Sequence, residues 1–161
     1  RVLSELVQKN MEIVGGVKYD ERERKLAAEV AKTFGAGDTI LVHAEKIRPL
    51  GKLVKEGSGG SSDVGDVSWS VPLASFGTAT FVPGAPGHSW QNVAVDGSTI
   101  GTKGLINAAK IFSLTAIDLF NNPSLLKQAK AEFDKVRGAD FKYESLLGDR
   151  KPALDYRKAS K

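Results

Sequence analysis

Residues 102–120, TKGLINAAKIFSLTAIDLF, contain the feature that most limits how this chain can fold. The run predicts a long helix that is apolar around most of its circumference, with polar side chains mainly at Asn107, Lys110 and Asp118. A helix of this kind is normally buried in a core or covered by another layer, because apolar surface in water is unfavourable. We therefore expect this helix to be buried or covered by another layer.

Three other segments repeat apolar residues with a helical period, and each has a recognisable start. The segments are 4–14, 20–34 and 124–136. Ser4 is a suitable N-cap for the first helix, and Asp20 lies before the acidic first turn of the second. Asn122 followed by Pro123 predicts the start of the third, because proline is favoured at the first helical position.

Two short segments predict strands. The better one is residues 74–82, ASFGTATFV, whose mixed small and aromatic content suggests burial on both faces, and residues 39–42 form a weaker candidate. Between them, residues 48–62 predict a loop and residues 63–71 a helical turn. Helices alternating with few strands indicate an α/β or α+β fold. Two or three strands are too few to cover helix 102–120, so we expect further strands or partner surfaces outside this chain.

Composition excludes several classes of protein. With 161 residues the chain fits one domain, and it has no cysteine, which excludes disulfides, zinc ribbons and thiol nucleophiles and is compatible with a cytoplasmic location. No apolar run approaches the ~18 residues of a membrane span, and no signal-peptide pattern is present. The net charge is +4, and cations concentrate in residues 139–161. They alternate with Glu144, Asp149 and Asp155, which predicts an extended, solvated tail and no nucleic-acid partner.

The residues suited to chemistry gather in 60–90. His88 follows the better strand on a loop rich in glycine and proline, where side chains are commonly aimed at ligands. Either it binds a metal or transfers protons, or it hydrogen-bonds the loop backbone. A catalytic metal takes about three protein ligands. The nearby donors match no local metal motif; they are His43, Asp63, Asp66 and Asp96.

The two aspartates of this stretch have two open interpretations. Asp63 and Asp66 could be paired carboxylates on one helical face, or Ser62 or Asp63 could cap the turn and leave Asp66 in water. No Gly-x-Ser-x-Gly motif, dinucleotide-binding fingerprint or Walker motif is present, so the sequence does not indicate a serine hydrolase or a nucleotide-binding loop.

Three motifs in order resemble the C-terminal part of M20-family metal-dependent amidohydrolases. They are GSSDVGDVSWSVP, then PGAPGHSWQ, then STIGTKGLINAAKIFSLTAIDLF. The opening RVLSELVQKNMEIVG also resembles the segment where the chain of this family re-enters its catalytic domain from the lid. The resemblance implies an α/β fold, part of a mixed-sheet α/β/α sandwich. Residues 1–138 would be the C-terminal portion of the catalytic domain and 139–161 the tail.

The resemblance implies a site with two divalent ions, zinc or manganese, in the intact protein. His88 falls on the last metal-ligand histidine of the family. Near the metals it places pocket groups, namely Ser62, Asp63, Asp66, Trp69, Gly87 and Trp90. Thr102 and Lys103 are further candidates, for binding a substrate carboxylate at the start of the long helix.

The other metal ligands, the glutamate base and the lid of the family have no counterpart between Arg1 and Lys161. We therefore expect a piece of a homodimeric enzyme that hydrolyses a small amide, an N-acyl amino acid or a p-aminobenzoyl-glutamate-like substrate. The piece alone would be inactive and would need the missing N-terminal half of the same protein. The alternative is a non-catalytic interaction module on a metallohydrolase scaffold.

Overall fold

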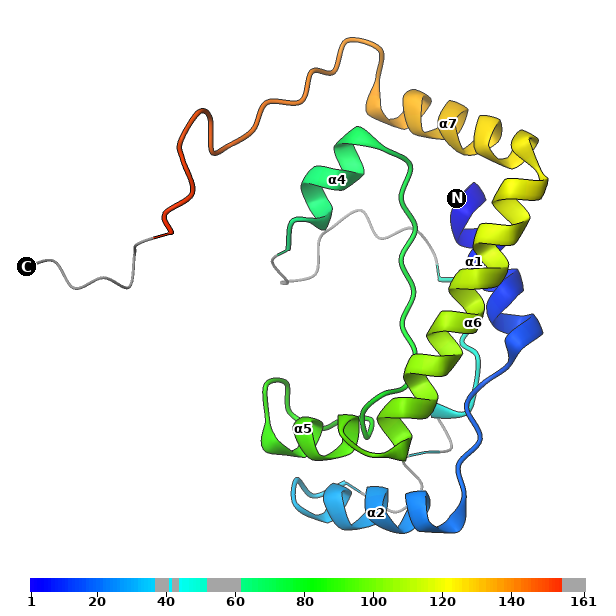
Figure 1. Cartoon of the computed structure of the whole chain (residues 1–161), viewed down its shortest axis with the longest axis vertical. Coiled ribbons are helices and arrows are strands. Elements are labelled where there is room, and N and C mark those ends of the chain that lie inside the picture. Colours follow the sequence, from blue (N-terminus) through cyan, green and yellow to red (C-terminus); the bar gives the residue numbers. More distant parts are fainter. Residues whose placement is uncertain (37–40, 42–43, 52–61, 155–161) are drawn as a thin grey trace, which may run out of the picture.

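The computed structural model describes residues 1–36, 41, 44–51 and 62–154. Its helices, in chain order, are α1 (Val2–Val14), α2 (Glu21–Lys32), α4 (Val64–Ser70), α5 (Trp90–Asp96), α6 (Thr99–Asn121) and α7 (Pro123–Arg137). Together they make an open arc (Figure 1), in which α6 is the long central helix, α2 and α5 lie at one end, and α4 and α7 lie at the other. No helix in these ranges is long and apolar enough to cross a membrane.

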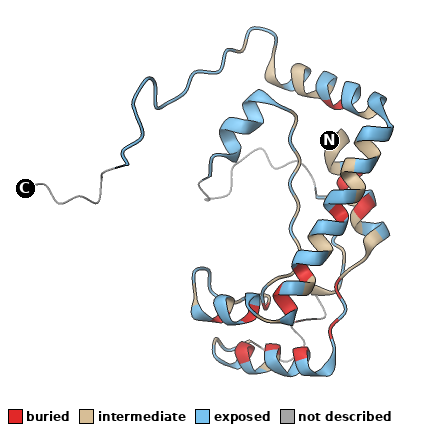
Figure 2. Ribbon diagram, in the orientation of Figure 1, coloured by how far each residue is buried: buried red, intermediate tan, exposed pale blue. Residues whose placement is uncertain are grey.

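The main core lies where α2, α5 and the start of α6 meet, and Figure 2 shows buried residues concentrated there. Its members are Val17, Tyr19, Ala27, Val30, Ala31, Leu41, Val82, Val95 and Ile100. A capping box at Asp20 begins α2, because the Asp20 side chain accepts from the Glu23 N–H and the Glu23 side chain accepts from the Asp20 N–H. Burial, reinforced by the charge of Glu23, raises the pKa of Tyr19 to about 12.

A second buried region joins α1 to α6 and α7. Leu6 and Val7 of α1 and Ile111 of α6 are buried there. Asn10 is also buried, and its Nδ2 donates to Thr115 Oγ1 and to Asp118 Oδ2, both at 3.1 Å. The polar side chain therefore has partners, as a buried amide requires. These contacts fix α1 along one side of α6.

The predicted α/β sandwich is wrong. None of the residues that the structure describes forms a strand, and the described secondary structure is helical. Residues 74–82 are extended but pair with no neighbouring strand among those residues, so the predicted buried strand is also wrong. A β-like composition makes a strand only when another backbone supplies the ladder hydrogen bonds. Residues 39, 40 and 42 of the weaker candidate lie outside the described ranges, and Leu41 is helical.

The four predicted long helices exist, with different limits. Helix α1 begins before Ser4, which is therefore not its N-cap, and α6 begins at Thr99 after Ser98. The turn predicted at 63–71 is α4. Helix α5 was not predicted, although Ser89 at its N-cap accepts from the Asn92 N–H as such residues commonly do.

The long apolar helix is only partly covered by the described residues, as the expectation of cover from outside this chain requires. Along α6, only Ile100, Gly101, Gly104 and Ile111 are buried. The larger apolar side chains that remain exposed are Leu105, Ile106, Phe112, Ile117 and Phe120. Helix α6 is covered mainly by α1, α5 and the extended segment 74–82. The rest of its apolar circumference has no covering layer within the described residues.

Gly104 lets α6 approach the extended segment closely. A methyl group at this position would collide with the Ala79 carbonyl oxygen and lie 2.8 Å from Thr80 Cγ2. We predict that Gly104→Ala lowers the free energy of unfolding by about 1–3 kcal/mol, the range for an overpacked core. Chemical denaturation measures it. Gly65→Ala in α4 is the control, since nothing lies within 4 Å of the added methyl group, and it should be neutral or stabilising. Equal losses in both variants would contradict the close approach.

Candidate functional site

His88 lies on the loop that joins the extended segment to α5. It is the only non-glycine residue with positive φ among those the structure describes, at 53°. A non-glycine residue in this left-handed region costs on the order of 1 kcal/mol, although histidine tolerates it better than most. Its side chain is exposed. No hydrogen bond to the imidazole is found within the described ranges, so the interpretation that His88 hydrogen-bonds the loop backbone gains no support.

The residues beside His88 shape the loop. A Cβ atom added at Gly87 would have nothing within 4 Å, so the loop is open there. Trp90 is the first residue of α5 and is 61% exposed. Asn92 holds the loop from the other side, because its Nδ2 donates to the Pro86 carbonyl at 3.0 Å. The loop thus presents an exposed imidazole next to an exposed indole.

Helix α4 and the two residues before it carry the other predicted pocket residues. Ser62 Oγ accepts from the Val64 N–H at 3.3 Å, so the serine caps the first turn, whereas Asp63 occupies the N-cap position without a side-chain hydrogen bond. Asp66 Oδ1 accepts from the hydroxyl of Tyr143 at 2.7 Å. This hydrogen bond raises the pKa of Tyr143. Asp66 therefore has a hydrogen-bond partner other than water.

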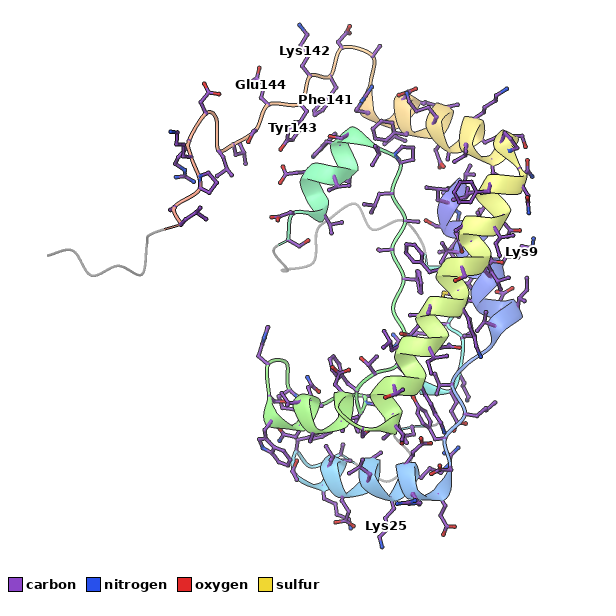
Figure 3. All side chains as sticks on the ribbon, in the orientation of Figure 1. Lys9, Lys25, Phe141, Lys142, Tyr143 and Glu144 are labelled. Atoms are coloured by element: carbon purple, nitrogen blue, oxygen red, sulfur yellow. The ribbon has the colours of Figure 1, made fainter. Side chains whose placement is uncertain are left out.

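Trp69 of α4 stacks on Phe141. The ring centroids are 4.6 Å apart and the planes are inclined by 18°. Both Trp69 and Asp66 therefore contact the segment that follows α7, which Figure 3 shows passing beside α4. The sequence predicted a solvated tail here, and residues 142–154 are exposed, but Phe141 and Tyr143 of this segment also contact the candidate pocket helix.

Lys103 has a different partner from the predicted substrate carboxylate. Its Nζ donates to Glu23 Oε2 at 2.6 Å and to the Lys18 carbonyl at 3.0 Å. Glu23 is 3% exposed, and burial would raise the pKa of its carboxyl. The hydrogen bonds from Lys103, Thr99 and the Asp20 backbone outweigh burial and hold that pKa below its ordinary value. Lys103 thus joins α6 to α2.

Thr102 lies inside the first turn of α6. Its N–H and its hydroxyl both donate to the Ser98 carbonyl, at 3.1 and 3.2 Å. Because α6 starts three residues before the predicted start, the free N–H groups of its first turn belong to earlier residues. The backbone of Thr102 is therefore not available to an anion, and the substrate-binding role of Thr102 and Lys103 stays a prediction.

The structure separates the two halves of the candidate site. In Figure 1, α4 lies at one end of the extended segment and the loop leading into α5 at the other. A segment of about ten extended residues spans on the order of 30 Å. No three His, Asp or Glu side chains lie close enough to hold a metal ion in the described part of the chain, and His43 is outside it. The predicted site residues therefore form two separate groups. One is the loop that carries the exposed His88, and the other is α4 with Asp66 and Trp69.

A groove of about 570 Å³ runs along the same extended segment, between it and α1. Its wall is formed by residues 46–51 and 75–81 together with one face of α1. None of the predicted site residues lines it. No local sequence pattern indicates this groove, because the segments that form it are distant along the chain.

The described residues thus provide one candidate metal ligand, His88, within an all-helical structure. The chain is 35% identical over 115 residues, 71% of its length, to the B subunit of p-aminobenzoyl-glutamate hydrolase from Escherichia coli strain K12. The match spans 20% of the length of that protein, so this chain corresponds to about a fifth of its relative. No protein-family model matches the chain. No solved structure matches it either.

Two groups of functional interest were missed from sequence. Glu23 was assigned only to an acidic first turn, although it is buried and paired with Lys103. Phe141 and Tyr143 were assigned to the tail. Their spacing of two residues, with Lys142 and Glu144 between and after them, is a signal that was available, because alternate residues of an extended chain face the same side.

Proposed function

We propose that this chain is the C-terminal part of the catalytic domain of an M20-type, metal-dependent amidohydrolase. The intact protein hydrolyses the amide bond of p-aminobenzoyl-glutamate or of a similar N-acyl amino acid. The observation that carries the proposal is the 35% identity over 115 residues to a protein named as part of a p-aminobenzoyl-glutamate hydrolase. Since that match covers a fifth of the relative, the remaining parts of the site belong to sequence outside residues 1–161.

His88 is the residue of this chain that we assign to the metal site. The backbone conformation of His88 supports the assignment. Glycine would adopt this left-handed conformation at a lower free-energy cost, so a histidine at this position indicates that the imidazole itself has a function. Its exposure supports it as well, since a ring nitrogen is available to an incoming ligand. One imidazole fits one coordination position, and the described residues contain no group of three ligands that could hold a metal ion.

Two divalent ions, zinc or manganese, would supply Lewis-acid polarisation of the amide carbonyl and an activated water. The role of this chain in that chemistry would be to bind one of the ions through His88. The Asn92–Pro86 hydrogen bond helps to fix the loop that carries the imidazole. No described residue is assigned as the general base, so the 161-residue chain alone is expected to be inactive.

The test uses the full-length protein from which this sequence comes. Release of p-aminobenzoate from p-aminobenzoyl-glutamate is measured with and without chelator, and the metal-to-protein ratio is measured by mass spectrometry. We expect hydrolysis that the chelator abolishes. His88→Asn should lower kcat/KM by about 100-fold or more and reduce the metal content, because loss of even an outer partner of a metal ligand costs about 10–100-fold. Asparagine tolerates the left-handed backbone, so the variant should fold.

His43→Asn is the matched control, since His43 is the only other histidine of the chain, and it should retain its metal. A folded full-length protein that binds no metal and hydrolyses nothing would overturn the proposal and favour the interaction module. Retention of metal and activity by His88→Asn would remove His88 from the site while leaving the enzyme class intact.

A further inference from the structure

Helix α4 is poorly anchored by packing. It has seven residues, none of them buried, and its apolar side chains Val64, Val67 and Trp69 are about half exposed. Figure 1 shows it standing apart from α1 and α6, at the end of the extended segment. A short helix without buried contacts is marginal by itself. Something other than a core must therefore hold α4 in its place.

Two side chains from beyond α7 make that contact. Phe141 stacks on Trp69 with ring centroids 4.6 Å apart, and the Tyr143 hydroxyl donates to Asp66 Oδ1 at 2.7 Å. The two contacts join positions more than 70 residues apart in the sequence. They alternate along an extended backbone, so both face α4 while Lys142 between them faces the other way, as Figure 3 shows.

We propose that residues 139–145 form a strap whose Phe141 and Tyr143 are positioning residues for α4, and through it for Asp66 and Trp69. The stack fixes the orientation of the helix, and the hydrogen bond fixes the Asp66 carboxylate. The catalytic part of this inference rests on the proposed function, in which Asp66 and Trp69 belong to the substrate pocket. The inference that the strap holds α4 in place rests on the contacts alone.

The strap has a simple physical basis. An offset aromatic stack and a hydrogen bond to a carboxylate each act only when the two segments are already aligned. Helix α4 has no buried side chain to align it, so the strap supplies the alignment. Removing either contact should therefore loosen α4 locally while the core around Ile100 and the contacts of α1 with α6 remain.

The test measures amide hydrogen exchange of α4 in the full-length protein by mass spectrometry. Phe141→Leu removes the stack and Tyr143→Phe removes only the hydroxyl. Each should speed exchange of residues 64–70 by about 2- to 10-fold, the equilibrium factor that such a contact provides. Phe141→Tyr keeps an aromatic ring and should restore the slow exchange. Lys142→Ala is the control, because this residue is exposed and its side chain lies on the side of the segment away from α4 in Figure 3.

Steady-state kinetics on p-aminobenzoyl-glutamate distinguish an effect of the strap on the substrate pocket from an effect on the stability of α4 alone. We expect Phe141→Leu and Tyr143→Phe to lower kcat with little change in KM, and Lys142→Ala and Phe141→Tyr to behave as wild type. Unchanged α4 exchange in both loosening variants would overturn the strap. Faster exchange with unchanged kcat would overturn the positioning role. If the wild-type protein hydrolyses nothing, the proposed function fails, and the exchange measurement still decides whether the strap exists.

Discussion

Lys103→Met is expected to lower the free energy of unfolding at pH 7 by about 2–3 kcal/mol. The substitution leaves the Glu23 carboxylate, 3% exposed, without the ammonium that now lies 2.6 Å away. Removing one partner of a fully buried pair costs about 3–5 kcal/mol, and the value here is smaller because Lys103 is 37% exposed. Denaturant unfolding followed by circular dichroism measures the change.

The same variant should change the pH dependence of stability. In the wild type the pKa of Glu23 is lowered from 4.5, so its contribution is fully present above that value and is lost as the pH falls through the folded-state pKa. Without Lys103, burial is opposed only by the hydrogen bonds from Thr99 and the Asp20 backbone, so the pKa of Glu23 should rise relative to wild type and the charged carboxylate should stabilise the fold less. The deficit of the variant relative to wild type should therefore be largest near pH 7 and smaller near pH 4.

Lys130→Met is the matched control for Lys103→Met. Lys130 pairs with Asp134 across one turn of α7, and both side chains are largely exposed. Such pairs contribute about 0.3–0.5 kcal/mol. Equal losses in the two lysine variants, or a deficit at Lys103 that does not depend on pH, would show that the link between α2 and α6 is not electrostatic.

Ile111→Ala is expected to cost about 2–5 kcal/mol. Ile111 is 0% exposed and lies where α6 meets α1, so truncation removes buried methyl groups and leaves a cavity. Leu105→Ala is the control on the same helix, because Leu105 is 66% exposed and should change stability by less than about 0.5 kcal/mol. The midpoint and slope of chemical denaturation compare the two. A large loss at Leu105 would mean that a layer covers this face of α6 in solution.

The helices could be predicted because their signals are local. Asp20 with Glu23 makes a capping box three residues apart, and Pro123 marks the first position of α7, so a few neighbouring residues decide each boundary. The start of α6 was misplaced by three residues because Ser98, a sufficient N-cap, was overlooked. Local signals of this kind do not depend on the rest of the fold.

The sheet could not be predicted correctly because a strand is not a local structure. Residues 74–82 have the composition of a buried strand, yet the described chain offers no backbone to pair with them, and the segment packs beside Gly104 instead. The resemblance to an α/β family suggested partner strands that the described residues do not contain. Composition thus indicated an extended conformation, which is present, and a sheet, which the described residues do not form.

The candidate site divides in the same way. His88 could be identified from the sequence as a candidate metal ligand, because it is a histidine in a segment rich in glycine and proline. The left-handed φ and the exposure of His88 could not be predicted, since both depend on how the loop joins α5. The contacts of Asp66 and Trp69 with the segment after α7 also required the structure, because the partners lie more than 70 residues apart.

The sequence by itself determined where the helices form and which residues carry suitable chemistry, because caps, periodicity and side-chain type act over a few residues. Only the tertiary structure decided that Lys103 pairs with a buried carboxylate, which side chains of α6 stay exposed, and that Phe141 and Tyr143 contact α4. Each of these results depends on which distant segments share space. Burial and pairing arise from that arrangement, and the local pattern of a sequence does not contain it.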